Sequence, residues 1–138
     1  MSINYLAVLV CGVLAMLGGY IWYGPLFGKR WMEVIGSDKK SQEERKKMQA
    51  SAGPLYLVQF LLTLFQVYVL AYLMVCWPGS NGWKLSTFLW AGFVMPTIAA
   101  SAMWNNDSSK VSWARFLLQA GYQLVMFIIY GYILTVWI

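Results

Sequence analysis

The sequence contains no histidine and few charged residues, with ten lysines and arginines and five carboxylates among its 138 residues. Histidine is the commonest general base and a frequent ligand of metal ions, so its absence argues against acid–base catalysis and against a metal site. The carboxylates all fall in polar segments, at Glu33, Asp38, Glu43, Glu44 and Asp107. No acid is therefore predicted inside a membrane span, where a proton-coupled exporter needs one.

Long stretches of the chain carry no charge, although 60% of all residues are hydrophobic. Four such stretches occur, at residues 1–28, 48–83, 85–106 and 116–138. A helix needs about 20 predominantly apolar residues to cross a bilayer, so each stretch can hold one crossing. The turn-forming run from Pro78 to Gly82 limits the second stretch to a single helix. We predict an all-α fold, an integral membrane four-helix bundle in a single domain, with helices at about 4–23, 55–77, 84–104 and 114–137.

Disulfide chemistry is also disfavoured. Cys11 lies midway along the first predicted span, and Cys76 lies near the outer end of the second. Because a helix rises about 1.5 Å per residue, the two thiols differ in depth by roughly 10 Å, which is too far for a disulfide. The chain also lacks a glycine-rich phosphate loop, so we predict no catalytic residue, no metal and no cofactor.

Lysine and arginine are concentrated in alternate connections between the predicted helices. Seven lie between the first and second helices, and two more, Lys110 and Arg115, lie between the third and fourth. Only Lys84 falls between the second and third. The positive-inside rule then places both termini outside a plasma membrane, with the cations beside anionic lipid on the cytoplasmic side. Anionic lipid, and not nucleic acid, is the partner that this charge indicates.

The segment that follows the first helix, residues 25–53, is predicted to form a cytoplasmic interfacial and charged loop. Gly24 is expected to break the first helix, and Pro25 to begin a short amphipathic helix whose apolar stripe is Phe27, Trp31 and Ile35. Gly36 is expected to end it. The predicted interface anchors are Trp22, Tyr23, Phe27, Lys29, Arg30 and Trp31.

The rest of this loop predicts a second, exposed helix. Ser41 and Glu44 have the spacing of a capping box, in which a serine side chain binds the backbone N–H three residues later. Pro54 is expected to open the second membrane helix.

Three motifs are spread along the chain. The first is Trp22-Tyr23-Gly24-Pro25-Leu26-Phe27-Gly28-Lys29, followed by Trp31 and Gly36. The others are Gly92-Phe93 with Pro96-Thr97, and Ala120-Gly121-Tyr122 with Leu124-Val125. Together they resemble the small bacterial membrane proteins grouped as domain of unknown function 1761, although Gln123 stands where members commonly have histidine. The resemblance implies a four-helix integral membrane protein and no established activity.

Neutral polar side chains recur inside the predicted spans. Gln59, Thr63 and Gln66 share one face of the second helix, and Gln119 and Gln123 share one face of the fourth. An unmatched amide costs several kcal/mol in hydrocarbon, so both stripes are predicted to face the interior of the bundle. The predicted ligand-binding residues are Gln59, Thr63, Gln66, Thr97, Gln119, Tyr122 and Gln123.

Two interpretations of these polar residues remain open. They can act as interhelical hydrogen bonds that fix helix register, each contributing about 0.6 kcal/mol. Alternatively, they line a pocket for a neutral or lipid-like ligand, rimmed by Tyr23, Tyr56, Tyr122 and Trp104. A further stripe of small residues, Cys11, Ala15 and Gly19, predicts close helix packing within the bundle or against a second copy.

The sequence favours a binding or accessory component without catalysis of its own, acting alone, as a homo-oligomer or within a larger membrane complex. A protomer of a facilitative transporter or channel is the alternative. An enzyme ranks third, because the spans offer tyrosine, serine and amides but no acid–base pair.

Overall fold

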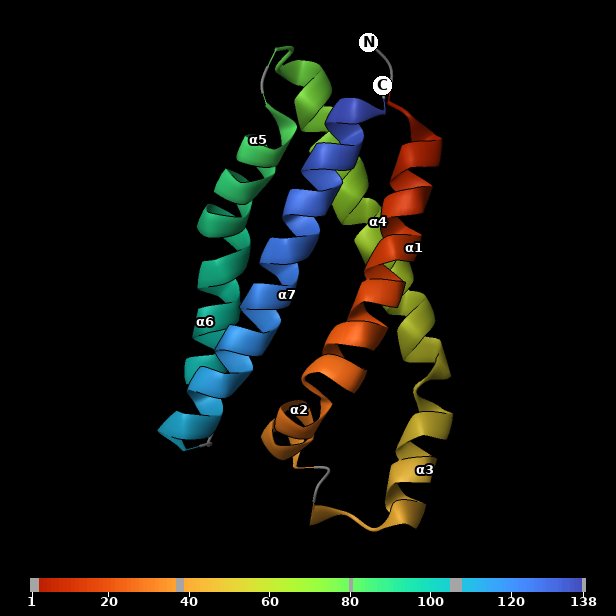
Figure 1. Cartoon of the computed structure of the whole chain (residues 1–138), viewed down its shortest axis with the longest axis vertical. Helices are drawn as coiled ribbons and strands as arrows, with labels where there is room; N and C mark the ends of the chain where they lie inside the picture. Colours follow the sequence, from red (N-terminus) through yellow and green to blue (C-terminus); the bar gives the residue numbers. More distant parts are fainter. Residues whose placement is uncertain (1–2, 37–38, 80, 105–107, 138) are drawn as a thin grey trace.

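The computed structural model describes residues 3–36, 39–79, 81–104 and 108–137, and nearly all of them are helical (Figure 1). The elements in chain order are α1 (Tyr5–Ile21), η1 (Trp22–Leu26), α2 (Gly28–Ile35), α3 (Gln42–Ser51), α4 (Gly53–Cys76), α5 (Gly82–Leu89), η3 (Trp90–Val94), α6 (Met95–Met103) and α7 (Ser109–Val136). Four continuous segments are long and apolar enough to cross a membrane, namely Tyr5–Leu26, Gly53–Cys76, Gly82–Met103 and Ser109–Val136. The predicted all-α class with four membrane-crossing helices is confirmed.

The last span begins earlier than its charge-free stretch indicates. α7 starts at Ser109, five residues before the predicted start, so that Lys110 and Arg115 belong to the helix. Ser108 caps it by accepting a hydrogen bond from the Val111 N–H. A search for uncharged residues finds the part of a helix that fits hydrocarbon, whereas hydrogen bonding and capping decide where the helix begins.

α7 occupies the centre of the bundle. It packs against α5 and α6 on one side and against α1 and α2 on the other, while α4 packs mainly on α1 (Figure 1). The Asn4 side-chain amide donates a hydrogen bond to the Trp137 carbonyl at 2.8 Å, so the start of α1 and the end of α7 lie side by side. α2 and α3 lie at the opposite end (Figure 1). Four crossings therefore bring both ends of the chain to one side of the bundle.

The small-residue stripe of α1 packs inside the bundle. Cys11 and Ala15 are almost completely buried in the main hydrophobic core, together with Val67 of α4 and Tyr130 of α7. Of the two alternatives for this stripe, packing within the bundle is confirmed. Large apolar side chains such as Phe88 remain exposed on the outer surface, as lipid contact allows.

α5 and α7 approach each other closely through small residues. Gly82 of α5 faces Gly131 of α7, and the Ser86 side chain is fully buried beside them. A Cβ atom on either glycine would overlap the backbone of the other. Small residues allow such close approach, and van der Waals contact between the two backbones then stabilises the pair.

Gly24 and Pro25 do not end the first helix, so that prediction is wrong. The chain continues through η1, a π-helical turn in which the Phe27 N–H donates to the Trp22 carbonyl at 3.0 Å. This wider turn accommodates Pro25, which has no N–H to donate. The helix axis breaks at Phe27, whose backbone leaves the helical region (φ −125°, ψ 21°). Pro96 likewise follows a π-helical turn, η3.

Three local predictions for the connecting segment are confirmed. Gly36 ends α2 with a left-handed backbone (φ 78°), a conformation that favours glycine. Ser41 caps α3 by accepting a hydrogen bond from the Glu44 N–H at 3.2 Å. Pro54 stands in the first turn of α4.

The glycine contact between α5 and α7 predicts a specific loss of stability. In Gly131→Ala the new methyl group would force the two backbones apart, so we expect the free energy of unfolding to fall by about 1–3 kcal/mol. Titration with sodium dodecyl sulfate in mixed micelles measures this. The control is Gly92→Ala, where nothing lies within 4 Å of the new Cβ atom. Equal effects of the two substitutions would contradict the close-packing argument.

Candidate functional site

The structure separates the predicted polar stripe of α4 into buried and exposed parts. The Thr63 side chain is buried and its hydroxyl donates to the Gln59 carbonyl at 2.8 Å, while the Gln59 amide donates to the Thr63 Oγ1 at 3.2 Å. Gln59 and Gln66 are exposed. The prediction that this stripe faces the bundle interior is therefore wrong for both glutamines. The reason is that α4 packs mainly on α1 and turns Thr63 and Val67 inward.

The polar residues of the other spans are also only partly brought together. Gln119, Tyr122 and Gln123 are half-buried on α7, whereas Thr97 is exposed on α6. The Thr97 hydroxyl donates to the Phe93 carbonyl at 2.8 Å, one turn before the proline-containing segment. This bond gives the threonine a structural partner within its own helix. The assignment of these side chains to a ligand stays a prediction.

Aromatic side chains of η1, of α2 with its N-cap, and of α7 meet at one place, and we name this cluster the aromatic junction. Its members are Trp22, Tyr23, Phe27, Trp31 and Tyr122. The ring centroids of Tyr23 lie 4.6 Å from Trp31 and 5.5 Å from Tyr122, in tilted arrangements that aromatic pairs prefer. Of the predicted rim, Tyr23 and Tyr122 therefore come together, while Tyr56 and Trp104 are 62% and 85% exposed elsewhere.

Backbone carbonyls of α7 and α1 hold this part of the bundle together. The indole N–H of Trp22 donates to the Leu118 carbonyl at 3.0 Å, and that of Trp90 donates to the Ala120 carbonyl at 3.1 Å. Each indole opens a π-helical turn, η1 or η3. The Tyr122 hydroxyl donates in turn to the Ala15 carbonyl of α1. Trp22 thus packs between helices, and its role as a lipid-interface anchor stays a prediction.

α2 is docked on the first turns of α7. Val34 is buried against Ala114 and Leu118, and Trp31 packs beside them. The Arg115 guanidinium donates to the Val34 carbonyl at 3.1 Å, close to the C-terminal end of α2, where a positive charge is favoured. Phe27 and Ile35 are exposed. The buried side of α2 is therefore centred on Val34, whereas the sequence predicted a stripe of Phe27, Trp31 and Ile35.

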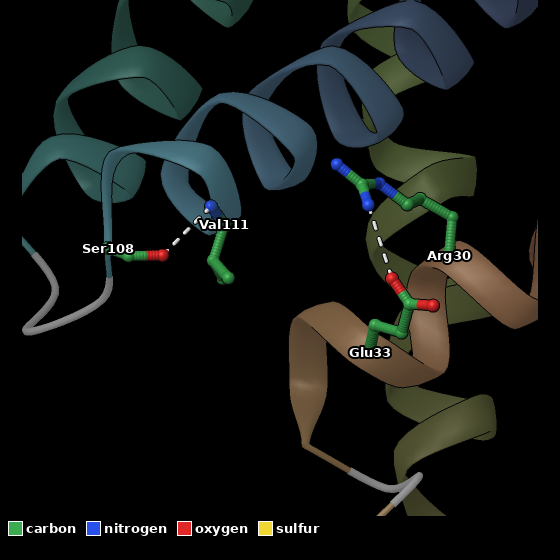
Figure 2. Close-up of polar contacts among 4 residues, drawn as sticks. All are labelled: Arg30, Glu33, Ser108 and Val111. Carbon is green, nitrogen blue, oxygen red and sulfur yellow. Dashed lines mark hydrogen bonds and ion pairs between the residues drawn. The ribbon is translucent and has the colours of Figure 1, made fainter.

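Figure 2 shows two polar contacts at this end of the bundle, and in one of them Arg30 pairs with Glu33 on α2 at 3.2 Å. Both side chains are about half exposed, at 42% and 54%, and such a surface ion pair contributes little to stability. The Ser108 cap of α7 lies nearby in the same view. Lys29 is exposed beside this pair, and contact of Lys29 and Arg30 with lipid headgroups stays a prediction.

A cavity of about 340 Å³ lies between α6 and the first turns of α7. Its lining residues are Ala99, Ala102, Met103, Ser109, Ser112, Trp113 and Phe116. The walls are apolar and aromatic, with two hydroxyls and no charged side chain. This volume and this chemistry fall within the range of sites for small molecules, which start at about 300 Å³.

Sequence reasoning missed this cavity although a signal for it exists. Ser109, Ser112, Trp113 and Phe116 follow the i, i+3, i+4, i+7 spacing of one helix face, but only if α7 begins before residue 114. Gln119 and Gln123 continue the same face by one and two further turns. The serine N-cap at Ser108 is the feature that would have extended the predicted helix.

Comparisons with known proteins identify a family and nothing closer. A family model described as "Protein of unknown function (DUF1761)" matches residues 6–135, which include all three motifs. No curated protein and no solved structure matches the chain.

The hydrogen bond from the Tyr122 hydroxyl of α7 to the Ala15 carbonyl of α1 can be tested by removing a single oxygen atom. Tyr122→Phe keeps the ring in the aromatic junction and removes the donor to Ala15, so we expect the free energy of unfolding to fall by about 0.5–1.5 kcal/mol. Titration with sodium dodecyl sulfate measures the change. The matched control is Tyr132→Phe on the same helix, whose side chain is 60% exposed. No difference between the two variants would show that this bond does not stabilise the bundle.

Proposed function

The chain belongs to the DUF1761 family of proteins of unknown function, and we propose that it binds a small uncharged amphiphile between α6 and α7. In this proposal it is a multi-pass protein of the bacterial plasma membrane, a binding or accessory component without catalysis of its own. The observation that carries the proposal is the cavity of about 340 Å³ between these helices.

The lining of the cavity indicates the chemistry of its ligand. Met103, Trp113 and Phe116 offer apolar contact to a hydrocarbon chain. Ser109 and Ser112 can each donate to or accept from a hydroxyl or ester oxygen. No charged side chain lines the cavity, so its walls offer a charged headgroup no partner of opposite sign. A monoacylglycerol is the simplest probe with the right combination of groups.

The position of the cavity favours binding over transport. All lining residues belong to the second half of α6 and the first turns of α7, at one end of the bundle. A transporter or channel needs a path along the whole span. Gln119 and Gln123, on the cavity-lining face of α7, extend the polar surface by two turns, and they are the predicted ligand-binding residues best placed to contact the same ligand.

A brominated monoacylglycerol tests the proposal, because bromine quenches tryptophan emission at short range and Trp113 lines the cavity. In nanodiscs we expect saturable quenching that Trp113→Phe removes. Ala99→Leu fills the cavity and should weaken binding at least tenfold. Loss of one hydroxyl, in Ser112→Ala, should weaken it roughly fivefold, which corresponds to about 1 kcal/mol.

Ala100→Leu is the matched control, because Ala100 adjoins Ala99 on α6 but is exposed and does not line the cavity. This variant should bind like the unmodified protein. Quenching that rises linearly without saturation, or that is equal in the Ala99 and Ala100 variants, would refute the site.

The proposed orientation makes a second prediction. Asn81→Cys stands at the end of the bundle that holds Asn4 and Trp137, and Lys46→Cys stands on α3 at the other end. In a Cys76→Ser background, a membrane-impermeant maleimide applied to intact cells should label the first variant, and should label the second only after permeabilisation. The reverse pattern would place both ends of the chain in the cytosol.

A further inference from the structure

Two exposed glutamines of α4, Gln59 and Gln66, lack sufficient hydrogen-bond partners. Gln66 lies near the middle of the span Gly53–Cys76, and within the described ranges its side chain makes no hydrogen bond. Gln59 makes a single side-chain bond, to Thr63 of its own helix. An amide facing hydrocarbon leaves donors and acceptors unmatched, at a cost of several kcal/mol. In a membrane, exposed amides therefore indicate a surface that another helix covers.

These glutamines belong to a regular seam along α4, which we name the glutamine seam. Its members, separated by alternating steps of four and three residues, are Leu55, Gln59, Leu62, Gln66, Val69, Leu73 and Cys76. All except Leu73 are exposed. This is the a/d spacing of a left-handed coiled coil, with both glutamines at a positions, where a polar residue sets register and the number of strands.

The rest of the bundle leaves the glutamine seam open. α4 turns Thr63, Val67 and Leu70 into the core. On the far side of that stripe, Gly12 of α1 lies against Leu64, and Tyr5 of α1 stacks on Tyr68 with ring centroids 6.3 Å apart. α1 therefore covers the flank of α4 opposite to the seam.

We propose that the glutamine seam pairs with the same seam of a second copy of this chain, in a parallel two-stranded coiled coil within the membrane. A carboxamide carries both a donor and an acceptor, so it is complementary to itself. In a two-fold dimer each a-position residue meets its own counterpart, and Gln66 of each copy then satisfies the other. Copies inserted by the same charge rule have the same orientation, which makes the pairing parallel.

A native cysteine of the glutamine seam allows this dimer to be tested by disulfide cross-linking. Cys76 is a free, exposed thiol at the last d position of the seam, where parallel pairing brings the two copies of the residue close together. Cys11 is a free thiol that is buried in the core, and it serves as an internal control. Neither residue has to be introduced, so the unmodified protein can be tested in its own membrane.

The experiment is mild oxidation of membranes with copper(II) phenanthroline. As two thiols form one disulfide, two copper(II) ions accept one electron each and the two protons pass to water. We expect a non-reducing gel to show a species of twice 15.7 kDa. It should persist in Cys11→Ser and disappear in Cys76→Ser. Absence of this species from the unmodified protein, or a disulfide to a different protein, would overturn the proposal.

Seam variants distinguish a specific dimer from random collision. Gln66→Leu removes the interhelical hydrogen bonds and should lower the initial rate of cross-linking roughly threefold to thirtyfold. Leu62→Ala, in the seam, should also lower it, while Leu61→Ala should not. Leu61 is the matched control because its exposure, 55%, nearly equals the 56% of Leu62, yet it lies outside the seam. Energy transfer between labelled copies under lipid dilution gives the dimer affinity independently, and equal values for the two leucine variants would overturn the proposal.

Discussion

The need to give every polar group a partner inside hydrocarbon determines the form of this protein. Lipid offers no hydrogen bonds, so the backbone of each span is helical, and hydroxyls such as those of Thr97 and Thr135 bind carbonyls of their own helix. Where Pro25 and Pro96 interrupt the regular backbone hydrogen bonding of a helix, π-helical turns continue it. The tryptophans that open these turns then donate to carbonyls of α7. Helix formation and helix packing are in this way two results of one constraint.

Much of the fold was predictable because that constraint acts on residue types. The charge-free stretches located the four spans, and local signals placed the left-handed Gly36 and the Ser41 cap. Two helix boundaries differ from the predicted ones, at Pro25 and at the start of α7. Both depend on hydrogen bonding along the backbone. A proline removes one donor from the sequence, but the structure shows whether a wider turn can compensate. Composition alone does not contain that information.

The sites were harder to predict, because they depend on which helices are neighbours. Periodicity correctly placed Gln59 and Gln66 on one face, but it could not show that α4 packs on α1 and leaves this face open. The aromatic junction joins residues one hundred positions apart, Trp22 and Tyr122. The cavity needs two helix faces in contact, and one of them was assigned to a loop. The way in which two helices pack together depends on the shapes of all the side chains along both of them.

The central position of α7 has a consequence for biosynthesis. It is the last of the four spans to leave the ribosome, yet it contacts each of the other three. Until it enters the bilayer, the indoles of both π-helical turns lack their acceptors, and Gly82 of α5 lacks the glycine that it packs against. The insertion of a single helix thus completes the packing of the three spans made before it.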